Sequence, residues 1–481
     1  LDCRGSVTPI KYCFGEDPNV KLVKHIALAD LAAEHLNRYV KVDVYICGVG
    51  EPCSVPYLLD VVCKSEREEC IKDCEFTEGF QITINDIRNA LGETNLLLEF
   101  VGLPKGRENQ VLLNYVKRYA RIQKDCRFGL GKLMVQVLRE KTVTPLVVMD
   151  AIDEVDLKDV KAREASRRRV YLIGTKRGLL RRGRLIGPVL KHPHTRQLTI
   201  LATCLEPTEV QLEAFKLTPE HQELFSALQD AQDEYLFDII GTHVCGIYGR
   251  PLAIEANLIA YHTPLHIPWK NEVIPGWVQL SNFGDTTTGK GIPRDLRKWL
   301  NLGIYSVVET ASRTGLLYFI DQSREGSVLG FGEFVLADRT LIIIDGSNKL
   351  NPEERAEFRE SYRLGYLKVR RVVSGSAPMR VRVINCENVK KPLTGYMYPC
   401  TAITENYQGP DIARLDLAIP YRREDVPSEI IFKDYGKKPA ELSKLQEAMR
   451  NNVLWAWSRS TEQIDFEPDA QEEIFQAAKV L

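Results

Sequence analysis

The chain has 481 residues, which is enough for roughly two to four domains. Its composition, 44% apolar and 27% charged with a formal net charge of −1, is ordinary for a globular protein and by itself indicates no particular partner. Twelve cysteines are too few for a disulfide scaffold of this length, and neither a membrane-spanning apolar run nor a secretory signal is visible. We therefore expect an intracellular protein, in the cytoplasm or nucleoid or in a eukaryotic nucleus, without a membrane partner.

The first part of the chain predicts a helical segment followed by β structure. Asp17 and Pro18 are typical of a helix cap and a first-turn proline. Apolar residues with helical spacing follow them, at Val20, Val23, Ala27, Leu31 and Leu36. Short strands are expected next, at 41–48, 96–102, 145–152, 169–175 and 198–204. Because they precede any alternation with helices, we expect a helical segment at 1–37 and a small barrel at 38–210.

The second part predicts an α/β domain. Thr218 and Pro219 open a helical stretch, and the main domain boundary is placed at 217. From Gly276 onward strands alternate with helices, which indicates a parallel sheet with strands at 277–283, 340–345, 380–387 and 415–421. The end of the chain is expected to be helical, with one apolar side formed by Leu442, Leu445, Met449 and Val453.

A glycine-rich loop at 284–291 is the strongest chemical signal in the sequence. It reads Gly-Asp-Thr-Thr-Thr-Gly-Lys-Gly, close to the phosphate-binding pattern G-x-x-x-x-G-K-[ST]. In that pattern backbone amides and the lysine bind phosphate oxygens, and a final hydroxyl ligates Mg²⁺. Gly284, Gly289 and Lys290 fit, whereas Gly291 has no hydroxyl. The alternative is a Gly-Thr-rich turn that matches by chance.

A second signal follows at 340–345, Thr-Leu-Ile-Ile-Ile-Asp, which predicts a buried parallel strand that ends in Asp345. Nucleoside triphosphatases place the Asp that holds Mg²⁺ at such a strand end. Many have a Glu at the next position to orient the attacking water, but here that residue is Gly346. Alone, the segment would be interpreted as an ordinary core strand; together with the loop it indicates a nucleotide site.

At these residues the chain resembles the minichromosome maintenance (MCM) family of replicative helicases. Gly284, Asp285 and Lys290 match the family loop G-D-P-G-x-A-K-S, and Asp345 and Lys349 match the family motif I-D-E-F-D-K-M. Residues 332–338, Gly-Glu-Phe-Val-Leu-Ala-Asp, resemble the segment E-x-G-A-L-V-L-A-D that precedes this motif. The resemblance covers 140 to the end well, and 1–140 only by the order of elements.

The resemblance implies roles for further residues. Asn388 falls on the family's sensor asparagine, and Arg414, within a segment similar to S-R-F-D-L, falls on its arginine finger. Tyr248 lies in 246–250, which is similar to S-I-Y-G-H, a segment near the bound base. The catalytic set implied is Lys290, Asp345, Asn388 and Arg414, and the nucleotide-binding set is Tyr248, Gly284, Asp285, Thr288, Gly289, Lys290 and Gly291.

Two basic clusters are candidates for DNA binding. Residues 161–184 contain ten Lys or Arg and one acid, Glu164. Such density indicates a phosphate-binding surface, or else an ordinary solvated loop. It coincides with the family's N-terminal DNA hairpin, and a second cluster coincides with its pore hairpin, where Arg370 takes the place of a lysine. The candidates are Lys176, Arg177, Arg181, Arg182, Arg184, Lys368, Arg370 and Arg371. Phosphate contacts would make such binding tolerant of sequence.

Metal sites are not expected. Cys63, Cys70 and Cys74 are spaced C-x₆-C-x₃-C, unlike the short-spaced pairs of structural zinc. Zinc is therefore not expected, and the alternative is that these cysteines are buried or surface thiols. The ATP and Mg²⁺ implied by the resemblance are expected to bind weakly.

The resemblance implies a multidomain fold, with an N-terminal OB-type β-barrel, an α/β AAA+ phosphate-loop domain at 217–425 and a truncated helical lid at 426–481. The expected function is DNA binding in replication, on single- or double-stranded DNA, by a homologue deficient in ATP hydrolysis. Two alternatives stay open: an active ATP-dependent helicase, and a regulatory protein that joins a competent MCM ring as a homo- or hetero-oligomer.

Overall fold

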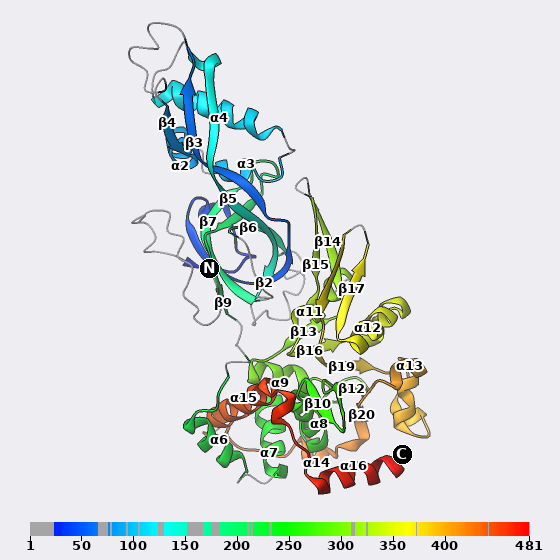
Figure 1. Ribbon diagram of the computed structural model, residues 1–481. Helices are drawn as coiled ribbons and strands as arrows, with labels where there is room; N and C mark the ends of the chain where they lie inside the picture. Colours follow the sequence, from blue (N-terminus) through cyan, green and yellow to red (C-terminus); the bar gives the residue numbers. More distant parts are fainter. Residues whose placement is uncertain are drawn as a thin grey trace. The chain divides into compact units, whose positions relative to one another are not determined.

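The computed structural model describes residues 24–480 apart from 66–75, 77–78, 93–94, 104–105, 124–128, 152–166, 175–181, 209–211, 213–214, 230–232, 309–312, 324–325, 372 and 441. The chain is multidomain, with mixed α/β structure in two compact units (Figure 1). Unit 1 comprises 1–209 and 319–330, and unit 2 comprises 210–318 and 331–481. Among the described residues no helix combines the length and the apolar character needed to cross a membrane.

Unit 1 is built on a ring of five strands. In chain order they are β2 (Tyr39–Val49), β5 (Leu133–Asp150), β6 (Arg168–Ile173), β7 (Arg182–Lys191) and β8 (Leu198–Ala202). The ring closes because β2 pairs with both β5 and β7, β5 with β6, β6 with β8 and β8 with β7. Only β6 and β8 are parallel in this ring. Val40, Val42 and Val44 alternate with partly exposed residues on β2 and enter the apolar core.

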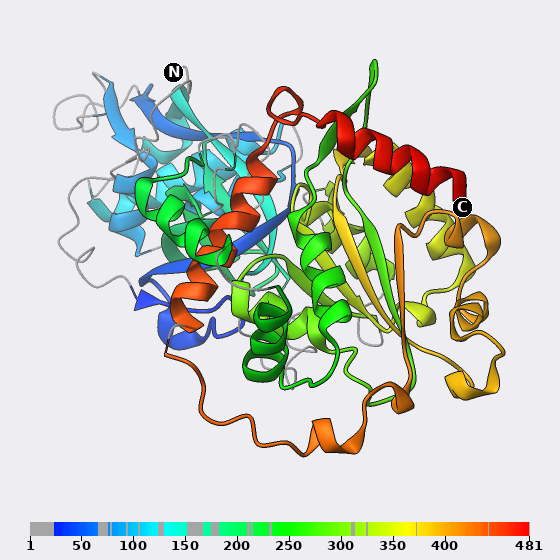
Figure 2. The same cartoon turned by 90° about the horizontal axis from the view of Figure 1, so that it is seen from below.

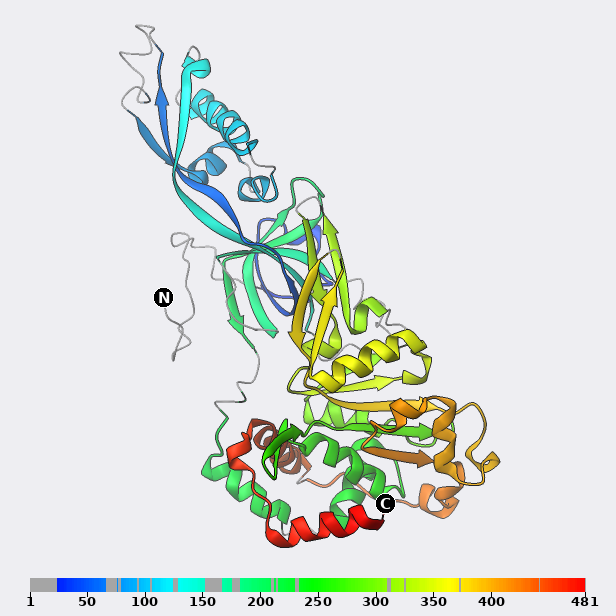
Figure 3. The same ribbon diagram turned by 45° about the vertical axis from the view of Figure 1, so that its right-hand side comes forward.

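An insertion between β2 and β5 carries its own apolar core. Strands β3 (Cys53–Cys63) and β4 (Phe80–Thr83) pair with each other, and β3 extends along β5. Helices α2 (Ile84–Leu91), α3 (Leu96–Glu99) and α4 (Glu108–Gln123) lie beside these strands (Figure 3). The strand expected at 96–102 is therefore wrong. Leu96, Leu97 and Leu98 are all buried, and a short continuous apolar run fits a buried helix as well as a strand.

The helix expected from Val20 to Leu36 is also wrong over its described part. Residues Lys24–His25 form β1, which pairs with β2, and Ala33–His35 form a single 3₁₀ turn. Asp150 at the end of β5 accepts the backbone N–H of Leu28 at 2.5 Å and of Ala29 at 2.8 Å. Partners in the ring, rather than helical turns, thus satisfy these donors, while Leu28 packs into the ring's core.

Residues 319–330, although distant in sequence, belong to unit 1. Strands β14 (Tyr318–Ser323) and β15 (Gly326–Phe331) extend its sheet through the pair Gly330–Gly48. A Cβ on Gly48 would lie 2.9 Å from the carbonyl oxygen of Leu329, so glycine permits this approach. Arg169 of β6 forms an ion pair with Asp321, which ties the hairpin to the ring.

Unit 2 contains a five-stranded parallel sheet in the order β13–β16–β19–β12–β20. The strands are β12 (Gln279–Gly284), β13 (Ile304–Val307), β16 (Leu341–Asp345), β19 (Arg382–Asn388) and β20 (Leu417–Tyr421). The predictions at 277–283, 340–345, 380–387 and 415–421 are confirmed within a few residues. Its three central strands, β16, β19 and β12, are almost entirely buried, as expected for continuous apolar strands such as Leu341–Ile344.

Helices pack around this sheet. Helices α6 (Pro219–Gln229), α7 (Asp233–Ile239) and α8 (Pro251–His262) precede the first strand of the sheet in the sequence. Helices α9 (Ile292–Leu300) and α12 (Pro352–Leu364) are among those that connect its strands. The expected C-terminal helices are confirmed as α15 (Leu442–Ser458) and α16 (Pro468–Val480). Helix α16 lies beside the hairpin β10 (His266–Trp269)–β11 (Glu272–Pro275), where the Trp269 and Phe475 rings approach to 6.2 Å (Figure 2).

Candidate nucleotide site

The loop, Asp345 and Asn388 meet at one edge of the sheet in unit 2. The carboxyl ends of parallel strands share an edge, and β12 ends at Gly284 opposite Asn388 of β19. Asp345, the last residue of β16, lies opposite Cys386 of β19. The three motifs predicted along the sequence therefore occupy one site, with the loop leading directly into α9.

The backbone of the loop requires glycine at two of its three glycine positions. Gly284 has φ +152°, and a Cβ there would lie 2.3 Å from the carbonyl oxygen of Tyr421. Gly289 has φ +100°, and a Cβ would lie 2.9 Å from Cγ2 of Ile247. Thr287 has φ +62°, a strained conformation for a β-branched residue. Gly291, by contrast, has helical angles of φ −75° and ψ −5° that any residue adopts.

Side chains hold the loop in a closed form. Lys290 donates from Nζ to the carbonyl oxygen of Gly284 at 3.1 Å and also to that of Asp285. Thr288 donates to the carbonyl oxygen of Asp285 at 2.8 Å. The Asp285 carboxylate accepts the backbone N–H of Leu393 at 2.9 Å. The Lys290 ammonium thus donates to carbonyl oxygens of its own loop. A bound phosphate would offer its oxygens as acceptors in place of these carbonyls.

Burial lowers the pKa of Lys290 to about 8, and nearby Arg250 acts in the same direction. The carboxylates of Asp285 and Asp345 act in the opposite direction and favour the charged form. A buried lysine with a strongly perturbed pKa, in a glycine-rich loop and near charged side chains, marks a candidate functional site.

Asp345 is held in place by Tyr305, whose hydroxyl donates to its Oδ2 at 2.5 Å. The next residue, Gly346, adopts the left-handed conformation with φ +78° and ψ +28°. Its N–H donates to the carbonyl oxygen of Cys386 at 2.9 Å, which fixes the turn after β16. A carboxylate therefore lies at the end of β16 on the same sheet edge as the loop, and the position that follows it has no side chain.

A buried glutamate lies next to the exposed Asn388. Glu387 is 1% exposed and accepts from Ser347 Oγ at 2.8 Å, from Asn406 Nδ2 at 3.0 Å and from the Tyr407 hydroxyl. Burial raises its pKa, although these hydrogen bonds act to lower it. Because both of its oxygens accept these hydrogen bonds, Glu387 is suited to hold the turn after Asp345. It is not suited to take the role of a glutamate at position 346. Sequence reasoning missed this residue, which carries no motif.

The segment that contains Tyr248 and Arg250 lies beside the loop. Ile247 approaches Gly289, and the Tyr248 ring stacks on Tyr435 with centroids 4.6 Å apart and planes at 13°. Arg250 donates from Nη2 to the carbonyl oxygen of Arg422 at 2.6 Å. Sequence reasoning missed Arg250, whose only signal was its place after the Tyr248-Gly249 pair.

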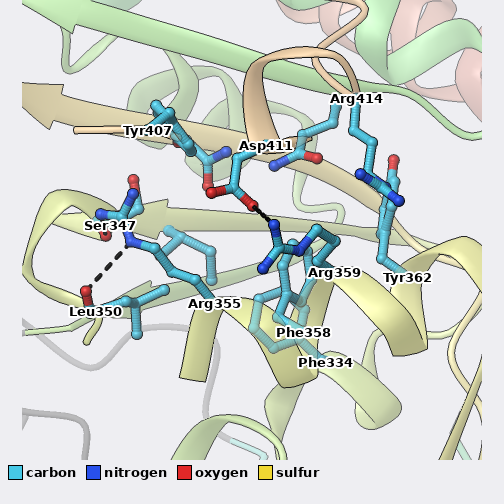
Figure 4. A pocket seen from close by; sticks show the side chains of 13 residues that line it. Phe334, Ser347, Leu350, Arg355, Phe358, Arg359, Tyr362, Tyr407, Asp411 and Arg414 are labelled. Atoms are coloured by element: carbon cyan, nitrogen blue, oxygen red, sulfur yellow. Dashed lines mark hydrogen bonds and ion pairs between the residues drawn. The ribbon is translucent and has the colours of Figure 1, made fainter. Parts of the chain in front are cut away.

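Arg414 lies at the opposite edge of the sheet from the loop. It lines a cavity of about 30 Å³ together with Gln279, the first residue of β12. The ion pair between Arg359 and Asp411, 3.3 Å long, lines the same cavity (Figure 4). That volume holds about two water molecules and cannot accept a nucleotide. At ~3.3 Å per residue, β12 separates its two ends by about 17 Å. Arg414 is therefore not brought together with Lys290, Asp345 and Asn388.

The DNA candidates differ in how they are engaged. Lys176, Arg177 and Arg181 lie outside the described residues. Arg184 binds Asp43 through Nε at 2.7 Å and Nη2 at 3.0 Å, which raises the pKa of Arg184. Arg182 donates to the carbonyl oxygen of Ala151 at 3.3 Å. Lys368, Arg370 and Arg371 are exposed on and just after strand β17 (Tyr366–Arg370).

The described residues contain no group of three or more His, Cys, Asp or Glu side chains placed to share a metal ion. Cys63 is buried at the end of β3, whereas Cys70 and Cys74 lie outside the described residues. No model of a known protein family matches the sequence, and a search of curated proteins finds no match either. The chemistry of the site therefore rests on its own loop, lysine and carboxylate.

Proposed function

We propose that the protein is an MCM-like, DNA-binding AAA+ protein of DNA replication that binds a nucleoside triphosphate weakly and hydrolyses it poorly. The observation that carries this proposal is the meeting of Lys290, Asp345 and Asn388 at one sheet edge. The loop and carboxylate supply binding groups for phosphate and Mg²⁺, while Gly291 and Gly346 leave out a metal ligand and the group that orients water.

The topology of each unit supports the finer fold assignment. A closed ring of five strands with one parallel pair is the arrangement of an OB-type barrel, a fold that binds oligonucleotides and oligosaccharides. A parallel sheet with a phosphate loop between β12 and α9 suits an AAA+ domain, followed by α15 and α16 as a helical lid. The domain limits proposed are 38–210, 217–425 and 426–481.

The position of Arg414 favours an assembly of several subunits, which includes the regulatory alternative in which the protein joins a ring with a competent family member. An arginine at the edge of the sheet opposite its own loop cannot stabilise charge at that loop. It could act only on a nucleotide held by another subunit. Co-purification with a competent homologue, and loss of that homologue's turnover with Arg414→Ala, would support this role.

The proposal is tested by measuring DNA binding and ATP turnover on one preparation. We expect single-stranded DNA of unrelated sequences to bind with similar affinity and with a strong salt dependence, because phosphates supply the contacts. Turnover of radiolabelled ATP with that DNA should be far below the ~1 s⁻¹ scale of phosphoryl-transfer enzymes. Turnover near that scale would favour an active helicase, and absence of DNA binding would reject both readings.

Nucleotide affinity is expected to fall as the pH rises above 8. Lys290 pairs with phosphate only as the ammonium, and its pKa is lowered to about 8 from 10.5. Above that pKa the ammonium population of the free protein falls about tenfold per pH unit. The lowered pKa also affects stability. Below about pH 8 the buried ammonium of Lys290 lowers the free energy of unfolding, and this destabilisation disappears as the pH rises from about 8 towards 10.5.

The measurement is titration with a fluorescent ATP analogue and Mg²⁺ between about pH 6.5 and about pH 9.5, a range that brackets this pKa. The matched control is Lys290→Arg, because a guanidinium remains charged throughout this range. Its affinity should stay level above pH 8 while that of the parent falls. Parallel profiles for the two proteins would show that Lys290 does not bind the phosphates.

A further inference from the structure

The hairpin of β17 (Tyr366–Arg370) and β18 (Ser374–Pro378) has two different faces. Along β17 the side chains alternate, with Leu367 and Val369 buried and Tyr366, Lys368 and Arg370 exposed. The partners of the exposed residues on β18 are Pro378, Ser376 and Ser374. The exposed face of β17 is thus a row of one aromatic ring and two cations beside small side chains, which leaves the row open to a ligand.

The hairpin is positive without local compensation. Residues 366–378 contain one lysine, two arginines and no acid. Within the part of the chain that the structure describes, Lys368 and Arg370 have no ion-pair partner. Arg363, at the end of the neighbouring helix α12, is instead paired with Glu360 at 2.9 Å. A ligand of this row must therefore carry repeated negative charge.

We propose that Tyr366 is a base-stacking residue that, together with Lys368 and Arg370, makes this row selective for single-stranded DNA. This inference rests on the proposed function as a DNA-binding protein and names the form of DNA that this hairpin takes. Positive grooves with aromatic side chains bind single strands, because every base has a face that can stack. Tyr366 is 42% exposed, so its ring is available to a base.

The spacing of the row suits an unstacked strand. Alternate residues of a β-strand lie about 6.6 Å apart, which is about twice the ~3.4 Å rise of stacked bases. A duplex keeps its bases stacked and paired and offers no free face to Tyr366. The cations would bind the phosphates of either form, whereas the ring contributes only when a base is free.

The test uses the full chain and fluorescence anisotropy with three probes: an oligothymidine, an abasic oligomer of equal length, and a duplex. Tyr366→Ala should weaken oligothymidine binding about 5- to 150-fold, as expected for loss of one stacked base. Binding to the abasic oligomer and the duplex should not change, nor should the dependence on salt. Tyr366→Phe should bind like the parent, because it keeps the ring.

Two controls separate stacking from charge and from surface effects. Lys368→Ala should weaken binding to all three probes and lower the salt slope on oligothymidine by about 0.7, the value for one phosphate contact. Tyr398→Ala removes a tyrosine that is 59% exposed elsewhere in unit 2 and should change nothing. Parent-like binding of oligothymidine by Tyr366→Ala, or an equal loss on the abasic oligomer, would overturn the stacking role alone. Failure of the parent to bind any probe would overturn the proposed function with it.

Discussion

Replacing Gly291 by serine and Gly346 by glutamate in the same chain is expected to raise ATP turnover more than either replacement alone. The serine hydroxyl would ligate Mg²⁺, and the glutamate would orient the attacking water. Each loss costs about 10- to 1,000-fold in rate, because phosphoryl transfer depends on positioning and charge stabilisation. Both groups act on one transition state, so their effects should not be independent.

The two positions accept a side chain at different cost. At Gly291 a Cβ would have Nη2 of Arg294 at 3.4 Å and Oδ2 of Asp295 at 3.7 Å as its nearest neighbours, which are ordinary contacts. Gly346 lies in the left-handed region, where a residue with a Cβ costs about 1–2 kcal/mol. We therefore expect Gly291→Ser to leave the free energy of unfolding nearly unchanged and Gly346→Glu to lower it by about that amount.

Phosphate release and urea unfolding, measured on the single and double variants, check both expectations. Gly346→Ala is the matched control, since it introduces the backbone strain without the carboxylate. Adding Lys290→Ala to the double variant should abolish the regained turnover. If the double variant is as inactive as the parent, the closed loop or a missing partner subunit is the deeper defect, and the two glycines are not what limits the rate.

Local patterns predicted the sheet of unit 2 and the loop. The run Leu341–Ile344 is too apolar to be anything but buried, and the glycines of 284–291 mark a turn between a strand and a helix. Parallel strands place their carboxyl ends at one edge, so Asp345 and Asn388 follow once the strands are known. This part of the site could be predicted because each step depends on neighbours in sequence.

The errors occurred where distant partners decide local structure. The segment after Val23 has helical spacing, yet Asp150, more than a hundred residues away, accepts its backbone N–H groups. At Leu96–Leu98 the apolar run fits helix and strand equally. Helix α4 was overlooked despite a readable signal, since Leu112, Val116 and Tyr119 fall on one helical face.

Local sequence patterns also could not predict which side chains contact the residues of the site. Nothing near Tyr248 in the sequence predicts its stack on Tyr435, and nothing near Asp345 predicts the hydroxyl of Tyr305. Such contacts join residues far apart in the chain and become visible only in the folded structure.

The second large effect is expected at Trp457, which anchors α15 to the sheet of unit 2. Its ring is 2% exposed, and its Nε1 donates to the carbonyl oxygen of Tyr261 at 2.6 Å. The guanidinium of Arg382 lies over the ring, 4.9 Å from its centroid. Arg382 is fully buried and donates to the carbonyl oxygens of Thr263 at 2.6 Å and Arg339 at 2.9 Å. Burial lowers the pKa of Arg382 to about 9, so the ring covers a cation that is already costly to bury.

Trp457→Ala is therefore expected to lower the free energy of unfolding by about 3–5 kcal/mol, the range for deleting a large buried aromatic side chain. The loss of free energy should lie at the upper end of this range, because the substitution also removes the aromatic ring that covers the guanidinium of Arg382. Trp455→Ala is the matched control: it deletes the same side chain from the same helix at a partly exposed position, where Arg459 lies over the ring at 4.9 Å. Its cost should be nearer ~1 kcal/mol. Urea unfolding followed by circular dichroism measures both, and equal losses in the two variants would show that α15 is not anchored through Trp457 and Arg382.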